Sequence, residues 1–314
     1  MHCICFMKVC IIVYLKIYKD GGMEMNVTGI IPALITPFDG NYDVNYSSLR
    51  HLVNRLIEQG VGGFYVCGST AECFLLSDEE RMRIMEVVTE EVNGRVGVIA
   101  HVGNINQRKA IEYAKHAQSC GVTAVSSVPP FYYKFKKEEI ASYYAAISDA
   151  VDIPLIVYCI PALSGVTLTV DDISNIMKVS NAQGLKYTAY DLFELEKIKR
   201  RHPDLALFYG RDEMFCSALP LGLAGAIGST YNVMPQKFIA IQKAYEEGNM
   251  KLASQIQSEA NSILEVLIQN DTKSSMKYLL TKGGIDCGGA RPPVTPLDDA
   301  KKAILDEIYP LIFR

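Results

Sequence analysis

From Gly29 onward, short apolar runs rich in valine and isoleucine alternate with stretches of helical periodicity. A run that is apolar throughout indicates a strand buried on both faces, and a helix after each such strand indicates a parallel sheet covered by helices. Eight such units favour a closed barrel over an open doubly wound sheet. The candidate strands are residues 29–38, 63–70, 96–103, 124–131, 154–161, 183–189, 205–211 and 225–232.

Helical patterns fill the intervals between the candidate strands. The pattern over 77–94 opens with Ser77 and Glu80 at the spacing of a capping box, and the pattern over 105–121 closes on a glycine placed like a C-cap. After the last strand, further helical patterns run from about 234 to 270, near 273–281 and around 297–309.

These patterns predict the fold class α/β, as a (β/α)8 TIM barrel with a C-terminal helical extension. We assign residues 27–233 to the barrel strands and helices, and residues 234–314 to the last barrel helix and the C-terminal helices. Residues 1–26 differ from the rest. Their apolar run is broken by Lys8 and Lys16 and is shorter than the ~20 residues that span a bilayer. We expect an N-terminal extension outside the fold, and a weak signal-like or interfacial anchor is the alternative.

Composition narrows the function classes. The net charge is −4 with a pI of about 5.8, so there is no basic excess to bind nucleic acid or an anionic membrane. Nine cysteines without a CxxC pair suit a reducing cytoplasm. Five histidines form no HxH or HxxxH cluster, which disfavours a metal, and no glycine-rich phosphate loop follows a strand. We expect no cofactor, and a small molecule as partner.

In such a barrel the reactive groups stand at the carboxyl ends of the strands and in the loops that follow. That rule selects polar residues after seven of the strands. They are Ser69, Thr70, Glu72, His101, Asn104, Tyr132, Tyr158, Lys186, Asp212, Glu213 and Ser229.

Lys186, on the sixth candidate strand, is the most informative of these residues. A lysine that reaches into a barrel mouth loses hydration, so its pKa falls toward neutrality and leaves a free amine. Such an amine forms Schiff bases with carbonyl substrates. The alternative is a strand-end lysine whose ammonium extends to solvent.

Schiff-base chemistry on a 2-oxo acid also needs a carboxylate clamp and a proton carrier. Ser69 and Thr70 offer two hydroxyls and successive backbone N–H groups at a strand-to-loop bend. Tyr158 can carry the proton if strands five and six are adjacent. Considered alone, Ser69 and Thr70 are typical of an ordinary turn, and Tyr158 is typical of a half-buried tyrosine. Their occurrence together on strands two, five and six favours a catalytic site.

The residues that carry this chemistry lie in motifs that resemble the family of sialic acid aldolases (N-acetylneuraminate lyases), in the superfamily that also holds dihydrodipicolinate synthase. The resemblance runs from about Thr28 to the C-terminus. The motifs are "GSTAE", "PPFYY", "VYCIPALSGVTL", "GLKYTAYDLFELE" and "YGRDEMF" followed by "GLAGAIGSTYNV".

The resemblance implies roles residue by residue. Lys186 would form the Schiff base with the C2 carbonyl, Tyr158 would transfer the proton, and Ser69 and Thr70 would hold the carboxylate. Tyr132 matches a tyrosine that the synthase branch presents to a neighbouring subunit's site, and family members are commonly homotetramers. The sugar-binding positions match Thr188, Gly210, Asp212, Glu213 and Ser229.

Four positions help to distinguish the lyase branch from the synthase branch of the superfamily, or depart from the family motifs. The synthase has an arginine where this chain has Leu163, so a second substrate carboxylate lacks its partner. Ala71 replaces a glycine of the family motif and alters the cradle if that position needs a positive φ. Cys159 and Arg211 replace an asparagine and a tyrosine, and we expect them to tune the far end of the pocket.

The sequence therefore predicts a metal-free class I aldolase that cleaves N-acetylneuraminate reversibly to N-acetyl-D-mannosamine and pyruvate. The first alternative is a dihydrodipicolinate synthase or another pyruvate-dependent sugar-acid aldolase. The second is a non-catalytic barrel that binds pyruvate or sialic acid.

Overall fold

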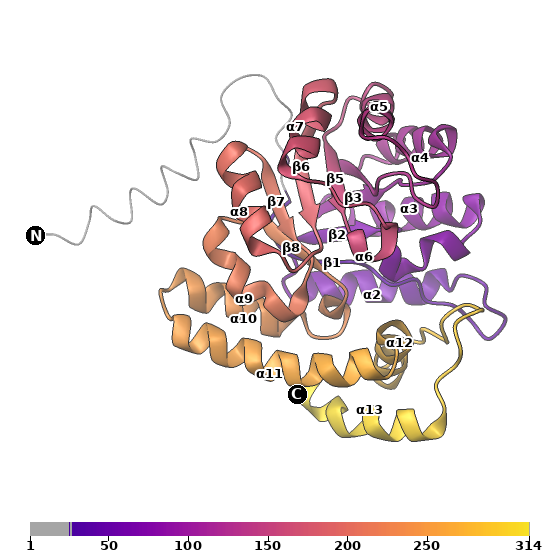
Figure 1. The fold of residues 1–314 in the computed structure, drawn as a ribbon. Helices are drawn as coiled ribbons and strands as arrows, with labels where there is room; N and C mark the ends of the chain where they lie inside the picture. The colour runs from indigo at the N-terminus through magenta and orange to yellow at the C-terminus, as the bar shows by residue number, and fades with distance from the viewer. Residues whose placement is uncertain (1–24, 26, 314) are drawn as a thin grey trace, which may run out of the picture.

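The computed structural model describes residues 25 and 27–313, and within them a ring of parallel strands is enclosed by helices (Figure 1). The strands are hydrogen-bonded in the order β1-β8-β7-β6-β5-β4-β3-β2, and every pairing between them is parallel. Their bounds are β1 Gly29–Pro32, β2 Gly63–Val66, β3 Gly97–His101, β4 Ala124–Ser127, β5 Leu155–Cys159, β6 Ala182–Tyr187, β7 Ala206–Tyr209 and β8 Gly225–Gly228.

The remaining edge, between β1 and β2, closes the barrel. The amide of Gly62 donates to the carbonyl of Ile30 at 2.8 Å, and the amide of Leu34 donates to the carbonyl of Tyr65 at 2.9 Å. Ala33 and Tyr65 form an isolated parallel bridge. The predicted (β/α)8 barrel is thereby confirmed, and full closure leaves no unpaired strand edge.

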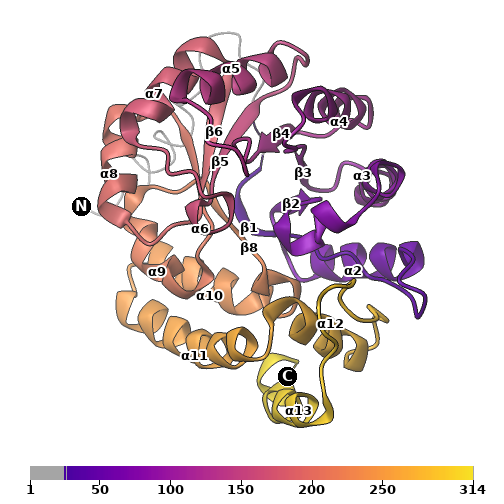
Figure 2. The same cartoon turned by 45° about the vertical axis from the view of Figure 1, so that its right-hand side comes forward.

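Helices surround the barrel, and the C-terminal helices gather on one side (Figure 2). The barrel helices are α2 Tyr46–Glu58, α3 Asp78–Val92, α4 Gln107–Ser119, α5 Lys137–Ser148, α7 Val170–Val179, α8 Leu192–Arg201 and α10 Pro235–Glu246, with the single-turn helices α6 Pro161–Ser164 and α9 Phe215–Ala218 in two loops. The extension comprises α11 Met250–Gln269, α12 Thr272–Lys282 and α13 Asp299–Ile312.

Alternation along each strand separates two cores. On β5, Leu155 and Val157 face the helices, whereas Ile156 and Tyr158 face the barrel interior. The interior is closed at the amino ends of the strands by Met25 and Val27, which pack with it. Since side chains on a strand alternate between faces, Lys186 shares the inward face with Gly184 and points into the barrel.

The strands end earlier than the sequence pattern suggests, because the polar residues after them fold into short 3-10 turns. These turns cover Ser69–Ala71, Cys73–Leu75, Asp212–Met214 and Thr230–Asn232. They curl over the carboxyl ends of the strands. The capping box of α3 is present, with Ser77 and Glu80 hydrogen-bonded to each other's backbone amides.

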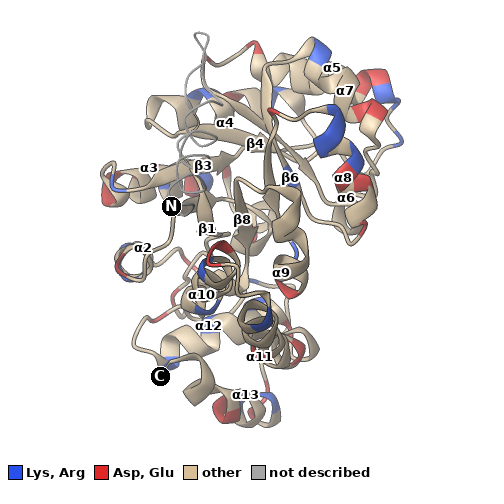
Figure 3. Cartoon of the chain, turned by 90° about the vertical axis from the view of Figure 1, so that its left-hand side faces the viewer, with Lys and Arg blue, Asp and Glu red and all other residues tan. Residues whose placement is uncertain are grey.

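Charged residues lie mostly on the helices and loops around the barrel (Figure 3). Within the described residues, no helix combines the length and the apolar character that crossing a bilayer requires. The expectations for residues 1–26 lie outside the described part of the chain, apart from Met25.

Candidate active site

Lys186 lies in the barrel interior between two tyrosine rings. Its side chain is buried, and Nζ stands 3.8 Å from the ring centroid of Tyr65 and 4.0 Å from that of Tyr158. Tyr158 of β5 is the register partner of Lys186 on β6, so the two side chains project from adjacent strands at the same height. No carboxylate of the described chain forms an ion pair with Nζ within 4.0 Å.

Burial decides the protonation state of this lysine. Desolvation lowers the pKa of Lys186 to about 7, and the Asp212 carboxylate and the Cys73 thiol oppose that fall. The ring faces of the two tyrosines stabilise the remaining cation only weakly. A substantial fraction of the side chain is therefore a neutral amine at neutral pH.

Tyr158 carries a phenol whose pKa burial raises above its usual range, so it is a proton donor at neutral pH. The hydroxyls of Thr188 and Ser69 lower that pKa in part, although Thr188 Oγ1 makes no hydrogen bond within 3.5 Å in the described structure. Tyr158 also meets Tyr65 edge-on, with ring centroids 5.8 Å apart. The amine, the phenol and the Ser69 hydroxyl thus occupy one corner of the barrel mouth.

The bend that holds Ser69 and Thr70 follows β2. It is bounded by Cys67 (φ 58) and Glu72 (φ 59), two residues other than glycine in the left-handed region. Ala71 has no positive φ and lies in the 3-10 turn, so an alanine is compatible with the backbone at this position. Its carbonyl accepts a hydrogen bond from Thr36 Oγ1 at 2.9 Å.

Glu72, selected by the strand-end rule, ties the bend to the C-terminal extension. Its carboxylate accepts from Lys277 Nζ of α12 at 2.6 Å and from the backbone amide of Arg291 at 2.8 Å. Both ionic side chains are buried, at 1% and 0% exposure for Glu72 and Lys277. Arg291 in turn holds Glu80 at 2.7 Å. Glu72 therefore holds the bend in place through these bonds, and it also lines the cavity above the bend.

Thr188 and Gly210 form a matched pair at the ends of β6 and β7. A Cβ placed on Gly210 would lie 2.0 Å from Thr188 Oγ1, so only glycine leaves room for that hydroxyl. In the described structure Thr188 Oγ1 is buried and has no hydrogen-bond partner. A buried polar atom without a partner is uncommon and marks this hydroxyl as available to a ligand.

Asp212 and Gly228 repeat the same arrangement between β7 and β8. Asp212 Oδ2 accepts from the amide of Thr230 at 2.9 Å and from its hydroxyl at 2.7 Å. Oδ1 has no partner in the described residues and would be only 1.9 Å from a Cβ on Gly228. Burial raises the pKa of Asp212 to about 6, against the effect of the Thr230 bonds.

Glu213, Arg211 and Ser229 lie farther out on the rim. The Glu213 carboxylate accepts from Tyr190 Oη at 2.8 Å and lies 3.7 Å from Arg211 Nη1. The Arg211 guanidinium stacks over the Tyr190 ring at 4.2 Å. Ser229 stands at the end of β8, where its carbonyl accepts from Asn232 Nδ2 at 2.7 Å.

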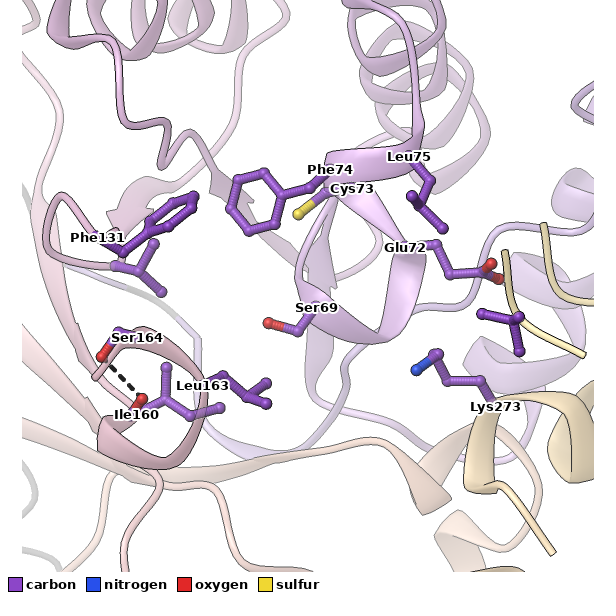
Figure 4. A pocket seen from close by; sticks show the side chains of 12 residues that line it. Ser69, Glu72, Cys73, Phe74, Leu75, Phe131, Ile160, Leu163, Ser164 and Lys273 are labelled. Carbon is purple, nitrogen blue, oxygen red and sulfur yellow. Dashed lines mark hydrogen bonds between the residues drawn. The ribbon is translucent and has the colours of Figure 1, made fainter. Parts of the chain in front are cut away.

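A cavity of about 300 Å³ opens over the bend (Figure 4). Phe74 and Phe131, with ring centroids 4.9 Å apart, form one wall, and Leu163 lies on the opposite side. Ser69 and Cys73 border the cavity, and Cys73 is near enough to influence Lys186. The apolar walls limit the access of water to this cavity, which Ser69 borders and which Lys186 does not line.

Of the other residues selected from the sequence, Tyr132 and Asn104 lie outside this cluster, whereas the His101 ring packs against it, 6.1 Å from the Tyr158 ring. Tyr132 is 84% exposed, with its ring against that of Tyr133, so the chain does not bring it to Lys186. Asn104 exchanges hydrogen bonds with the Tyr143 hydroxyl, at 3.2 and 2.9 Å, and stabilises its own loop. His101 is buried under the bend and bonds the Cys67 carbonyl.

The expectation that Cys159 tunes the pocket is wrong. Cys159 follows Tyr158 on the same strand and therefore faces the opposite side, into the core between the barrel and its helices. Sequence reasoning also missed Tyr65, the second ring against Lys186. Two features of the sequence could have identified it. Tyr65 is at a position of β2 whose side chain points into the barrel, and it lies just before the "GSTAE" bend.

Among the described residues, no group of three or more histidine, cysteine, aspartate or glutamate side chains could hold a metal ion. The chemistry available to the site is that of an amine, a phenol, hydroxyls and one carboxylate of raised pKa. Fold and site together define a class: (β/α)8-barrel proteins with a buried, largely neutral lysine at the catalytic end of β6.

The particular family follows from comparison with known proteins. The pattern of the dihydrodipicolinate synthetase family matches residues 26–309, and the chain belongs to that family. The N-acetylneuraminate lyase of Citrobacter koseri is 42% identical over 279 residues, which cover 88% of this chain and 94% of that protein.

Solved structures agree with this assignment. CdNal of Clostridium difficile, in complex with mannosamine, is 36% identical with a TM-score of 0.89, covering 91% of this chain and 99% of that one. A catalytic lysine mutant of the Ruminococcus gnavus sialic acid aldolase is 30% identical with a TM-score of 0.89, covering 93% and 97%.

Proposed function

We propose that the protein is a class I aldolase that cleaves N-acetylneuraminate reversibly to N-acetyl-D-mannosamine and pyruvate. The observation that carries this proposal is the burial of Lys186 between Tyr65 and Tyr158, which lowers its pKa to about 7. The relatives named N-acetylneuraminate lyase favour this substrate among those of the family.

In the proposed mechanism, the Lys186 amine adds to the C2 carbonyl of the open-chain substrate, and one water leaves as the protonated imine forms. The C4 hydroxyl then loses its proton, the C3–C4 bond breaks, and its electron pair moves through the imine to give an enamine and the free aldehyde. The enamine takes a proton at C3, and one water hydrolyses the imine to release pyruvate and the amine. Tyr158, placed beside Nζ, carries the protons.

The remaining roles follow the geometry of the mouth. Ser69 and Thr70 hold the substrate carboxylate above Lys186, because their bend lies over the two tyrosine rings. The unpartnered Thr188 Oγ1 and Asp212 Oδ1 suit a polyol chain. Gly210, Glu213 and Ser229 complete that end of the site.

We further propose a homotetramer, in which the exposed Tyr132 lies near an interface and completes the site of a neighbouring subunit. A monomeric mass in solution would contradict this assembly. We place the enzyme in the cytoplasm, without metal or cofactor. We assign 27–233 to the barrel, 234–314 to the last barrel helix and the appendage, and 1–26 to an N-terminal extension outside the fold, except for Met25, which packs in the barrel interior.

The decisive experiment is incubation with pyruvate and borohydride, followed by intact mass and peptide mapping. We expect a reduced pyruvyl adduct on Lys186 that is lost in Lys186→Ala. It should persist in Lys273→Ala, which removes the lysine on α12 that borders the same cavity. A folded sample that binds pyruvate without an adduct would leave the non-catalytic binding barrel as the better interpretation.

Substrate comparison then separates the aldolases. We expect turnover of N-acetylneuraminate and no condensation of pyruvate with aspartate semialdehyde, because Leu163 offers no charge to a second carboxylate. Condensation of the semialdehyde would favour the dihydrodipicolinate synthase alternative.

A further inference from the structure

The bend that carries Ser69 and Thr70 begins with a strained residue. Cys67 has φ 58, a conformation that costs an ordinary side chain free energy and that glycine adopts readily. Strain of this kind persists only where surrounding contacts hold it. Two contacts hold Cys67: its carbonyl accepts from His101 Nδ1 at 2.9 Å, and its thiol donates to the Arg81 carbonyl at 3.6 Å.

His101 is itself fixed from behind by Arg81. The Arg81 guanidinium donates to the carbonyls of His101 at 3.0 Å and Gly103 at 3.4 Å. It also stacks over the Tyr113 ring at 4.1 Å. His101 and Arg81 are 1% and 4% exposed, so this network is closed to solvent.

The shortest contact of His101 Nδ1 is with the Cys67 carbonyl at 2.9 Å, and Cys73 Sγ lies 3.9 Å from the same nitrogen. Because a carbonyl oxygen only accepts, Nδ1 carries the hydrogen, whereas Nε2 has no partner among the described residues. Burial and the Arg81 charge lower the pKa of His101 to about 3, so the ring is neutral across the working range of pH. Nε2 is packed against Gly103, where a Cβ would approach it to 2.7 Å.

The position of Cys67 is transmitted directly to the reactive lysine. Gly68, the next residue, lies against the Tyr65 ring so closely that a Cβ there would be 2.7 Å from a ring carbon. The same ring also contacts Lys186 Nζ, which lies 3.8 Å from its centroid. Ser69 and Thr70 follow immediately. A change at Cys67 therefore moves the two hydroxyls relative to the amine.

We propose that His101 is a positioning residue: its bond to the Cys67 carbonyl holds the left-handed bend that sets Ser69 and Thr70 over Lys186 for the carboxylate of a 2-oxo acid. This role rests on the proposed function. It predicts that loss of the donor weakens capture of the carboxylate and leaves the chemistry of Lys186 and Tyr158 in place.

A matched pair of amide variants tests the proposal. The side-chain nitrogen of asparagine can occupy the place of Nδ1, whereas that of glutamine extends one bond further. We expect His101→Asn to keep the KM for pyruvate, measured in condensation with N-acetylmannosamine, within about threefold of the parent. His101→Gln should raise that KM about 10-fold, with kcat changed by less than about threefold in both. Equal KM values in the two variants would overturn the role.

A second measurement tests whether His101 acts through the strained backbone at Cys67. Cys67→Gly in the His101→Gln background removes the need for a restraint, so we expect the KM for pyruvate to fall back to within about threefold of the parent. A folded double variant that still binds pyruvate about 10-fold more weakly would show that His101 does not act through the bend. If His101→Gln alone does not fold, the double variant is compared directly with the parent. A KM for pyruvate within about threefold of the parent then supports the role, and one about 10-fold higher contradicts it.

Borohydride trapping distinguishes failure of the positioning role of His101 from failure of the proposed aldolase function. A parent enzyme that forms no pyruvyl adduct contradicts the aldolase function and the positioning role together. A parent that forms the adduct, with indistinguishable KM values for His101→Asn and His101→Gln, contradicts the positioning role alone.

Discussion

The lowered pKa of Lys186 depends on the absence of an ion-pair partner within 4.0 Å of Nζ among the described residues. Tyrosine rings contact the amine, and the nearest carboxylate that influences it, Asp212, raises its pKa only in part against burial. A closer carboxylate would stabilise the ammonium and remove the nucleophile. The pKa of Lys186 is therefore set by desolvation against the opposing effects of Asp212 and Cys73.

The pH dependence of adduct formation follows from this balance. Because the pKa of Lys186 is lowered to about 7, the rate of pyruvate adduct formation should rise up to about pH 7 and then level off. A lysine in water would continue to gain rate toward its ordinary pKa of ~10.4. Cyanoborohydride trapping between pH 5.5 and 9 measures the midpoint. Asp212→Asn should move it to lower pH, and an upward movement would contradict the coupling.

The same burial should cost stability. The unfolded chain binds a proton at Lys186 up to pH ~10.4, whereas the folded chain releases it above about pH 7, so folding becomes more favourable as pH rises between these values. We expect Lys186→Met to raise the free energy of unfolding by ~2–4 kcal/mol at pH 7 and by much less at pH 10.

Urea unfolding at the two pH values measures this difference. Lys251→Met, at an exposed position of α11, is the control and should stay within ~0.5 kcal/mol. A Lys186→Met variant no more stable than its parent at pH 7 would show that burial does not carry the shift.

At the residue scale, the sequence identifies reactive groups better than orientations. Lys186 and Tyr158 are recognisable because polar residues at the ends of apolar strands stand out. Tyr65 is not, because an aromatic residue inside a buried strand looks like core. The error over Cys159 could have been avoided, since its neighbour Tyr158 must face the other way.

At the scale of elements, close contacts between strand ends shape the pocket. Thr188 at the end of β6 fits against Gly210 after β7, and Asp212 fits against Gly228 at the end of β8. Each glycine leaves space for a polar atom that has no hydrogen-bond partner within the described structure. Three adjacent strands thus direct two free polar groups into the mouth.

A single methyl group tests this arrangement. Gly210→Ala would place a Cβ 2.0 Å from Thr188 Oγ1, so Thr188 must move. We expect kcat/KM for N-acetylneuraminate to fall at least ~10-fold while pyruvate trapping at Lys186 persists. Gly40→Ala, where no atom lies within 4 Å of the new Cβ, is the control. Parental turnover in Gly210→Ala would contradict the role of this pair.

The periodicity predicted the elements well, since all eight strands and the helices between them are present at the expected places. The residues at which the strands end were predicted less accurately. Residues such as Ser69 and Thr230 continue an apolar run in the sequence, but their backbones turn into 3-10 helices under tertiary contacts. The gap between α10 and α11, at Gly248, is a local turn that a helical pattern conceals.

For the molecule as a whole, the C-terminal extension is part of the catalytic architecture. Helix α12 supplies Lys277 to the Glu72 carboxylate, and the loop before α13 supplies the amide and guanidinium of Arg291. No sequence pattern joins residues more than 200 positions apart, which is why this connection could not be anticipated.

Breaking the buried pair should be costly. Lys277→Met leaves Glu72 as a buried charge without its cation, and we expect the free energy of unfolding to drop by ~3–5 kcal/mol. The Lys282–Asp306 pair, at 38% and 43% exposure, provides the matched control, and Lys282→Met should cost ~0–1 kcal/mol. Urea denaturation compares the two. Equal losses would mean that burial does not determine the value of the Glu72–Lys277 pair.

The contact between Glu72 and Lys277 also orders events during synthesis. A chain still on the ribosome that has reached Tyr231 already holds every residue proposed to touch the substrate, yet the cation that completes the Glu72 site is not made until position 277. We therefore expect the bend that holds Ser69 and Thr70 to be among the last parts of the chain to reach its final state, because its Glu72 side chain gains its cation only when α12 has docked.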